Sequence, residues 1–308
     1  MIRKVLVAAA ALAAIGFAGS AAAADKTIGV ALASDTNPFY IAMLKGIENR
    51  AKQLGYKLSV VTAEEDVARQ LNGINDLIAK GVDGILASPI DAKALCSAFN
   101  KAKEAGIPMM AIARGSACKA QLLHIAVDEI RVGREIAEWT ARKIGGKGKV
   151  AMLAGPAGAQ AFMNFARGYE EGLKGHSGIE VVYRQELALT REMGLKHGED
   201  ALVAHPDVKA IYGANDELGM GAAQAVAAAG KKKDVIVTGM NGIPPAVRAV
   251  KRGAMDLTVV LNPVRWGVLG VDTMDGHFKG RKHDPRVYVG HVLVDKTNVD
   301  KFIRPKKK

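Results

Sequence analysis

The sequence predicts an α/β fold with two lobes, each built on a parallel sheet, and three observations support this prediction. Apolar strand-like runs alternate with helical patterns from Lys26 almost to the end of the chain, as in parallel βαβ units. A chain of 308 residues usually divides into two domains of about 150 residues each. Segments 82–89 and 208–215 resemble each other, and each is followed by one helix and another strand, which indicates two similar lobes.

The first half of the chain is expected to hold five strands with helices between them. The first helix begins at Asn37-Pro38 and ends at Gly55, and its apolar residues fall at steps of four and three, so they line one buried face. Further helices are expected over 67–78 and 92–105. The expected strands are 27–33, 58–62, 83–88, 107–113 and the short segment 124–127.

The same alternation begins again after Asp128. Helices are expected over 130–144, 161–174, 192–204, 217–229 and 244–252. Strands are expected over 150–154, 179–184, 208–213, 235–239 and 257–261. A final helix over 264–278 and a strand over 287–294 are left over. Because these two must be added to lobes that are already formed, we expect the chain to cross between the lobes more than once.

The N-terminus has the pattern of a secretory signal peptide over residues 1–24. Arg3 and Lys4 precede an apolar run, and a stretch of small residues ends at Ala24, where we expect cleavage. A membrane anchor is the alternative, but the apolar core is short for a span. Export places the mature protein in the periplasm. The full chain has a net charge of +12, and the mature protein, without Arg3 and Lys4, has +10. We interpret the basic residues as solvated surface and not as a nucleic-acid-binding surface.

The sequence lacks the motifs of common catalytic sites. It contains no phosphate-binding Gly-x-x-x-x-Gly-Lys-Ser/Thr, no Gly-x-Ser-x-Gly and no His-Glu-x-x-His. The glycines at Gly155 and Gly158 do not have the three-glycine spacing of a dinucleotide-binding loop. We therefore expect a protein that is not an enzyme and that uses no cofactor and no metal.

Two cysteines are expected at the ligand-binding edge of the first sheet. In parallel sheets, ligands bind beyond the carboxyl ends of the strands. Cys96 lies in the first turns of the helix that follows the third strand, and Cys118 lies in the loop after the fourth. In an oxidising compartment a disulfide between them is expected, with two buried free thiols as the alternative. The disulfide would hold the loop next to Arg114.

Several motifs, which occur in order along nearly all of the mature chain, resemble ribose-type periplasmic sugar-binding proteins, the type I family of ABC transporter solute-binding proteins. They are Ile28-Gly29-Val30, Asn37-Pro38-Phe39-Tyr40, Gly55-Tyr56, Ala204-His205-Pro206-Asp207-Val208, Asn215-Asp216-Glu217 and Gly239-Met240-Asn241-Gly242. The resemblance implies two Rossmann-like lobes joined by a hinge of three crossovers, near 127–128, 261–262 and 290–291. The N-terminal lobe would comprise 25–127 with 262–290, and the C-terminal lobe 128–261 with 291–308.

The resemblance also implies a set of ligand-binding residues. Asn37 and Asn215 match asparagines that hydrogen-bond sugar hydroxyls, and Arg114 matches an arginine with the same task. Phe39 and Tyr40 match a pair of rings that pack on the face of the sugar, although Tyr40 also suits core packing on its helix. A guanidinium and amides fit adjacent hydroxyls, while aromatic faces cover C–H surface.

Several positions depart from the sugar-binding pattern. Met163 stands in place of an arginine, Leu189 in place of an aromatic residue and Asn241 in place of an aspartate, and these three are expected at the ligand. Phe162, Asn164 and Thr190 are alternatives for the first two positions. Ala113 replaces a second aspartate and Leu261 a glutamine. Because a hydrogen bond to a charged group is worth about 1.5–3 kcal/mol, these losses disfavour an ordinary pentopyranose or hexopyranose.

The resemblance predicts a function in transport. The protein would capture a small hydroxylated ligand, such as a sugar, a polyol or a related metabolite, between two closing lobes and deliver it to an ABC permease in the inner membrane. A periplasmic sensing subunit for a membrane receptor or chemotaxis system is the alternative. A sugar-responsive repressor is disfavoured, because it would need a DNA-binding segment of about 60 residues before the core, where this sequence has the signal-like residues 1–24. We expect a monomer with no nucleic-acid partner.

Overall fold

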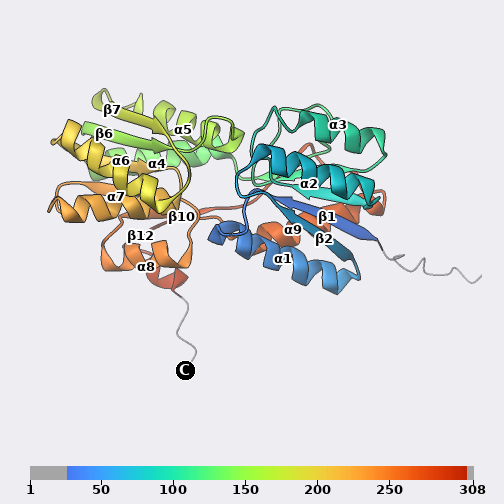
Figure 1. Cartoon of the computed structure of the whole chain (residues 1–308). Coiled ribbons are helices and arrows are strands. Elements are labelled where there is room, and N and C mark those ends of the chain that lie inside the picture. The colour runs from blue at the N-terminus through green and yellow to red at the C-terminus, as the bar shows by residue number, and fades with distance from the viewer. Residues whose placement is uncertain (1–25, 304–308) are drawn as a thin grey trace, which may run out of the picture.

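The computed structural model describes residues 26–303, which form two lobes side by side (Figure 1). In these residues there are two sheets of six strands, with the orders β11-β5-β4-β3-β1-β2 and β12-β10-β9-β8-β6-β7. Strand β12 pairs antiparallel with β10, and the other pairings are parallel. The predicted α/β fold is therefore confirmed. The predicted signal peptide over 1–24 lies outside the described residues.

The first lobe contains the early strands and one helix from late in the chain. Its strands are β1 (Thr27–Leu32), β2 (Lys57–Thr62), β3 (Gly84–Ala87), β4 (Met109–Ile112), β5 (His124–Ala126) and β11 (Arg286–Tyr288). Its helices are α1 (Pro38–Leu54), α2 (Val67–Ala79), α3 (Cys96–Glu104) and α9 (Pro263–Phe278). Helix α9 packs along α1, as Figure 1 shows.

The second lobe contains the middle of the chain and the last strand. Its strands are β6 (Lys147–Ala154), β7 (Gly178–Glu186), β8 (Val208–Gly213), β9 (Ile236–Thr238), β10 (Leu257–Val260) and β12 (Val292–Asp295). Its helices are α4 (Glu129–Lys143), α5 (Gln160–Leu173), α6 (Arg191–Ala204), α7 (Asp216–Ala228) and α8 (Pro244–Arg252), and a short 3-10 helix, η1, follows at Val299–Phe302.

Capping residues fix where several helices begin. Asn37 accepts a hydrogen bond from the Phe39 amide and Pro38 occupies the first turn of α1, so the helix begins where the sequence predicts it. Asp66, Asp128, Thr190 and Asn215 cap α2, α4, α6 and α7 in the same way. All five of these residues lie in the connection that follows a strand, so the caps place helix N-termini at the carboxyl ends of the sheets.

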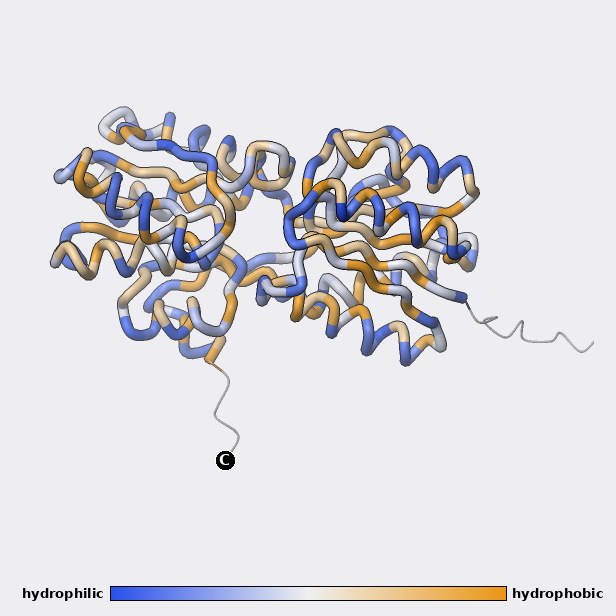
Figure 2. The backbone as a smooth tube through the Cα atoms, viewed as in Figure 1, coloured by the Kyte–Doolittle hydropathy of each residue, from blue (hydrophilic) through white to orange (hydrophobic). Residues whose placement is uncertain are grey.

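The core of each lobe consists of the strands and the inward faces of the helices. Figure 2 shows apolar residues concentrated in the strands, while the helices alternate apolar and polar positions. The contact between α1 and α9 is close because it is built on glycine: a Cβ on Gly46 would meet the Val264 carbonyl, and one on Gly267 would meet the Met43 carbonyl. In residues 26–303 no helix has both the length and the apolar character needed to cross a membrane.

Two predicted elements differ from the structure. The single strand predicted over 287–294 is two strands, β11 in the first sheet and β12 in the second, because the chain passes from one lobe to the other at 289–291. The helix predicted over 92–105 begins only at Cys96, because Asp91 accepts from the Lys93 and Ala94 amides and holds 91–95 as turns.

The chain passes between the sheets in three places. It leaves the first sheet after β5, returns after β10 and leaves again after β11. The residue boundaries predicted for the two lobes stay a prediction. In both sheets the strand order reverses next to the first strand of the lobe, between β1 and β3 and between β6 and β8. The loops that diverge at such a reversal leave a crevice at the carboxyl edge of the sheet.

Candidate functional site

A small cavity lies between the two lobes at these carboxyl edges. Residues from both lobes line it: Asn37, Phe39, Tyr40, Ala113, Arg114 and Trp266 from the first, and Ala161, Phe162, Phe165, Leu189, Asn241 and Leu261 from the second or the crossover after it. The volume of the cavity, counted as the space that the centre of a water molecule can occupy, is about 40 Å³. The cavity therefore suits a small ligand enclosed by both lobes.

Among the described residues that line the cavity, Arg114 is the one with a charged side chain. It is almost fully buried, with 2% of its surface exposed. Its two terminal nitrogens donate to the two carboxylate oxygens of Glu65, each over 2.7 Å. Its guanidinium also lies 5.6 Å from the Tyr40 ring centre and 5.2 Å from that of Phe162. Burial alone would lower the pKa of Arg114, but Tyr40 and Glu65 outweigh it and the pKa is raised, so the cation is retained.

Two side-chain amides face the same space. The Oδ1 atom of Asn37 is used as the cap of α1, which leaves its NH₂ group to donate to a ligand. Asn241 lies on a loop with a positive φ of 122°, and its backbone bonds to β10 through the Val259 carbonyl. Its side-chain amide has no hydrogen-bond partner among residues 26–303, so it is free to bind a ligand through both its oxygen and its nitrogen.

Aromatic side chains form much of the wall. Phe39 contacts Tyr40 and Trp266 edge to face, with ring centres 5.4 and 5.6 Å apart, and Phe162 lies 6.3 Å from Phe165. The Tyr40 hydroxyl is 3.1 Å from that of the buried Ser88. The indole nitrogen of Trp266 is buried and has no hydrogen-bond partner in the described residues. Such a wall favours a ligand with C–H surface and few polar groups.

The two lobes touch directly beside the cavity. The Ala92 amide in the first lobe donates to the Gly158 carbonyl in the second over 3.0 Å, and the cation–π contact of Arg114 with Phe162 also joins the lobes. These contacts describe a closed arrangement, in which the cavity is covered from both sides.

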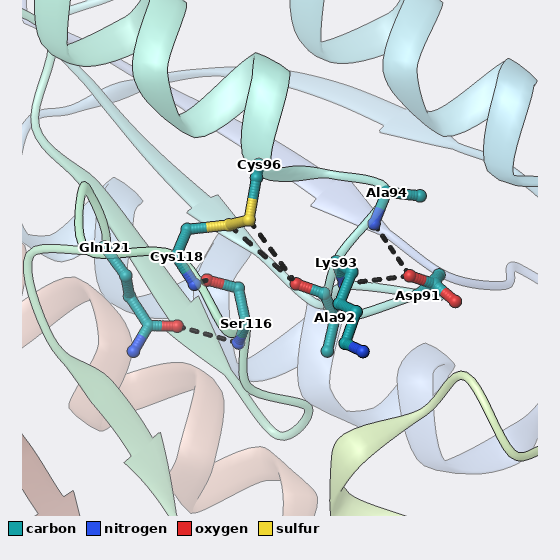
Figure 3. Close-up of a disulfide and its surroundings, with 8 residues drawn as sticks. All are labelled: Asp91, Ala92, Lys93, Ala94, Cys96, Ser116, Cys118 and Gln121. Carbon is teal, nitrogen blue, oxygen red and sulfur yellow. Dashed lines mark hydrogen bonds between the residues drawn. A yellow bond between two sulfur atoms is a disulfide. The ribbon is translucent and has the colours of Figure 1, made fainter.

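The expected disulfide is present and lies at this contact (Figure 3). Cys96 and Cys118 are bonded, with their Cα atoms 5.3 Å apart. Both sulfur atoms lie within 3.9 Å of the Ala92 carbonyl, which also accepts from the Ala117 amide over 2.9 Å. The disulfide therefore holds the peptide segment that reaches the other lobe.

The structure brings six of the eight predicted ligand-binding residues together. The cavity lining includes Asn37, Phe39, Tyr40, Arg114, Leu189 and Asn241, and their binding roles stay a prediction. Met163 is not part of the cavity lining and is 48% exposed, while the neighbouring Phe162 lines the cavity. Asn215 is buried as the cap of α7 and donates to the Leu189 carbonyl, so it supports the wall and does not line it.

Sequence reasoning missed four residues of the site. Ala161, Phe165 and Trp266 line the cavity, and Glu65 holds Arg114 from behind. Glu65 follows the second strand, and the rule that such loops meet at the carboxyl edge could have indicated it. Trp266 lies in the first turn of the helix that returns to the first lobe, so its place at the cavity depends on the crossover, which leaves no local signal in the sequence.

Comparisons with known proteins agree with this architecture. A family model described as a periplasmic binding protein domain matches residues 28–282. The ribose import binding protein RbsB of Haemophilus influenzae is 35% identical over 270 residues, which cover 88% of this chain and 91% of that protein.

Solved structures of ABC transporter solute-binding proteins have the same fold. One from Actinobacillus succinogenes with bound D-allose has a TM-score of 0.85 and 29% identity, and the match covers 90% of this chain and 100% of the other. One from Mycobacterium smegmatis with bound glycerol has a TM-score of 0.87 and 27% identity, and the match covers 92% and 98%.

Proposed function

This chain belongs to the periplasmic binding protein family, and from that membership we propose that it is the solute-binding protein of an ABC importer. It captures a small hydroxylated ligand, less polar than a common aldose, in the periplasm and delivers it to a permease in the inner membrane. The ribose import relative and the neighbours with bound allose and glycerol support a small hydroxylated ligand, and the apolar lining supports one that is less polar than a common aldose.

The observation that carries the proposal is the cavity enclosed by both lobes. Three polar side chains, Asn37, Arg114 and Asn241, face a lining that is otherwise aromatic or aliphatic. A few fixed polar groups in an apolar wall orient a small ligand and give specificity. Because residues of both lobes contribute, ligand binding stabilises the closed arrangement over an open one.

The polarity of the wall limits the ligand. At positions where the resemblance places polar contacts to sugar, Ala113 and Leu261 supply only apolar surface. A common aldose would leave hydroxyls unpaired against these residues, at a cost of about 1–3 kcal/mol for each buried group. Short polyols, deoxysugars and similar small metabolites that carry fewer hydroxyls than a common aldose lose less.

Further parts of the proposal concern the state of the protein. We propose that residues 1–24 are a cleaved signal peptide, that the mature protein is a monomer without a nucleic-acid partner, and that the bound ligand leaves chemically unchanged. Binding without turnover is what delivery to a permease requires, and the relatives in the comparisons are binding proteins.

A ligand screen tests the proposal. Small polyols and deoxysugars are expected to raise the melting temperature, whereas ribose and glucose are expected to have little effect. Arg114→Ala is expected to weaken binding of the best ligand about tenfold or more in isothermal titration calorimetry, because a hydrogen bond to a charged group is lost.

The control is Arg131→Ala, because Arg131 is an exposed residue on α4 away from the cavity. This variant is expected to bind like the wild type. The proposal is wrong if sugars, polyols and related metabolites all fail to stabilise the protein while another class of compound does. Equal affinity of Arg114→Ala and the wild type would place the site elsewhere.

A further inference from the structure

The wall of the cavity offers more hydrogen-bond donors than acceptors. The Nε atom of Arg114 and the indole nitrogen of Trp266 are buried donors without partners in the described residues. The Asn37 oxygen is used as a helix cap, and the Tyr40 hydroxyl is paired with Ser88. Among these side-chain oxygens, that of Asn241 is the one without a hydrogen-bond partner in the described residues. A ligand that satisfies this wall therefore accepts hydrogen bonds more than it donates them.

A small carboxylate would satisfy the same donors, so charge must decide between neutral and anionic ligands. Glu65 lies outside the cavity lining, and its carboxylate takes one N–H from each terminal nitrogen of Arg114. The pair is bidentate and carries no net charge. An anion that enters the cavity gives up its hydration and meets a cation that is already neutralised, with the Glu65 carboxylate behind it.

The backbone holds Glu65 in this position. Glu64 and Glu65 both have positive φ, 47° and 60°, so the chain turns sharply after β2. The Glu65 amide donates to the Ala33 carbonyl over 2.8 Å, and the Asp66 amide donates to the Ala63 carbonyl over 2.9 Å, so backbone hydrogen bonds fix the turn. The turn therefore presents Glu65 to Arg114 before any ligand arrives.

We propose that Glu65 is a specificity-determining residue, which makes the cavity select small neutral ligands that accept hydrogen bonds and reject carboxylates of the same size. The inference rests on the proposed function, because it concerns the same cavity. Glu65 acts through Arg114 and is a positioning residue, not a ligand contact.

The experiment compares matched pairs of neutral and anionic probes, glycerol with glycerate and ribitol with ribonate, by calorimetry at pH 7. In the wild type, each polyol that binds is expected to bind at least tenfold more tightly than its carboxylate. In Glu65→Gln, affinity for the carboxylate is expected to rise at least tenfold, because Arg114 then lacks its counter-charge. The melting temperature of this variant is expected to be lower without ligand and to recover with the carboxylate.

Glu64→Gln is the matched control, because Glu64 lies in the same turn and contacts Ser34, Asp35 and Thr36 instead of Arg114. It loses the same charge and is expected to keep the wild-type preference. A rise in carboxylate affinity of less than tenfold in Glu65→Gln, or an equal rise in Glu64→Gln, overturns the inference. If Glu65→Gln does not fold, the test is the affinity of the wild type for each polyol and its carboxylate. A carboxylate that binds the wild type as tightly as its polyol overturns the inference.

The two proposals fail in different ways. If no sugar, polyol or related metabolite binds the wild type, the proposed function is wrong, while a gain of carboxylate binding in Glu65→Gln still supports the role of Glu65. If polyols bind but the variant gains nothing, the proposed function stands and the role of Glu65 is wrong.

Discussion

At the scale of single residues, the loops of the second lobe depend on one buried acid. Asp216 follows the cap of α7 and has no exposed surface. Its carboxylate accepts from the Ile243 amide over 2.8 Å and the Thr258 hydroxyl over 2.5 Å, so it joins α7, β10 and the loop that carries Asn241. Burial raises its pKa to about 7, although these hydrogen bonds act in the opposite direction.

We predict that Asp216 makes the protein less stable as the pH rises from 4 to 7. The pKa of about 7 in the folded state lies above the ordinary value of 3.8, so the folded protein keeps a proton that the unfolded chain has released. Stability falls wherever the folded state binds more protons. In urea unfolding, the free energy of unfolding of the wild type relative to Asp216→Asn is expected to decrease over this interval and to level off above it.

The two curves would run parallel if Asp216 were ionised in the folded protein at pH 4. Parallel curves between pH 4 and 7 therefore contradict the prediction. Comparing the two proteins at each pH removes the contribution of other titrating groups that the substitution does not affect.

At the scale of elements, the disulfide ties two connections of the first lobe together. Cys96 begins α3, and Cys118 lies in the connection from β4 to β5. Both sulfur atoms lie close to the Ala92 carbonyl. The amide of the same residue donates to the Gly158 carbonyl in the other lobe. The disulfide thus supports the surface on which the second lobe closes.

We predict that replacing both cysteines by serine lowers stability and weakens ligand binding. Loss of a cross-link between residues 22 apart in sequence costs about 3 kcal/mol on the chain-entropy estimate. Urea unfolding measures this change, and calorimetry measures the accompanying loss of affinity for the best neutral ligand. Unchanged affinity in the double variant would show that the segment at Ala92 is ordered without the disulfide.

At the scale of the whole molecule, function depends on how closely the lobes can approach. Gly158 leaves room for this approach, because a Cβ at this position would meet the carboxylate of Asp91 in the first lobe. Asp91 cannot turn away freely, since it accepts from the Lys93 and Ala94 amides. A side chain at 158 therefore obstructs the closed arrangement without touching the core of either lobe.

We predict that Gly158→Leu prevents closure and weakens ligand binding at least tenfold. Small-angle X-ray scattering is expected to show that the best neutral ligand reduces the radius of gyration of the wild type but not of the variant. Gly175→Leu is the control, because Gly175 lies on the surface of the same lobe with only ordinary contacts. Ligand-induced compaction in Gly158→Leu would contradict the prediction.

The sequence was most informative where local chemistry decides the structure. The cap at Asn37-Pro38, the glycine at 55 and the apolar periodicity predicted the first helix closely, because each acts on its immediate neighbours. The strand over 287–294 was predicted less well, because an apolar run does not show that it is shared between two sheets. Phe162 lines the cavity and Met163 does not, because one step along a helix turns the side chain by about 100°.

The sequence by itself determined the α/β class, the alternation of elements, and the loops that lie at the carboxyl edges of the sheets, since these follow from periodicity and capping. Only the tertiary structure decided which side chains share the cavity. Trp266 reaches it because α9 returns to pack on α1, and Glu65 neutralises Arg114 across 49 residues of sequence. Such contacts depend on how the loops of two lobes meet in space, and no local pattern in the chain encodes that meeting.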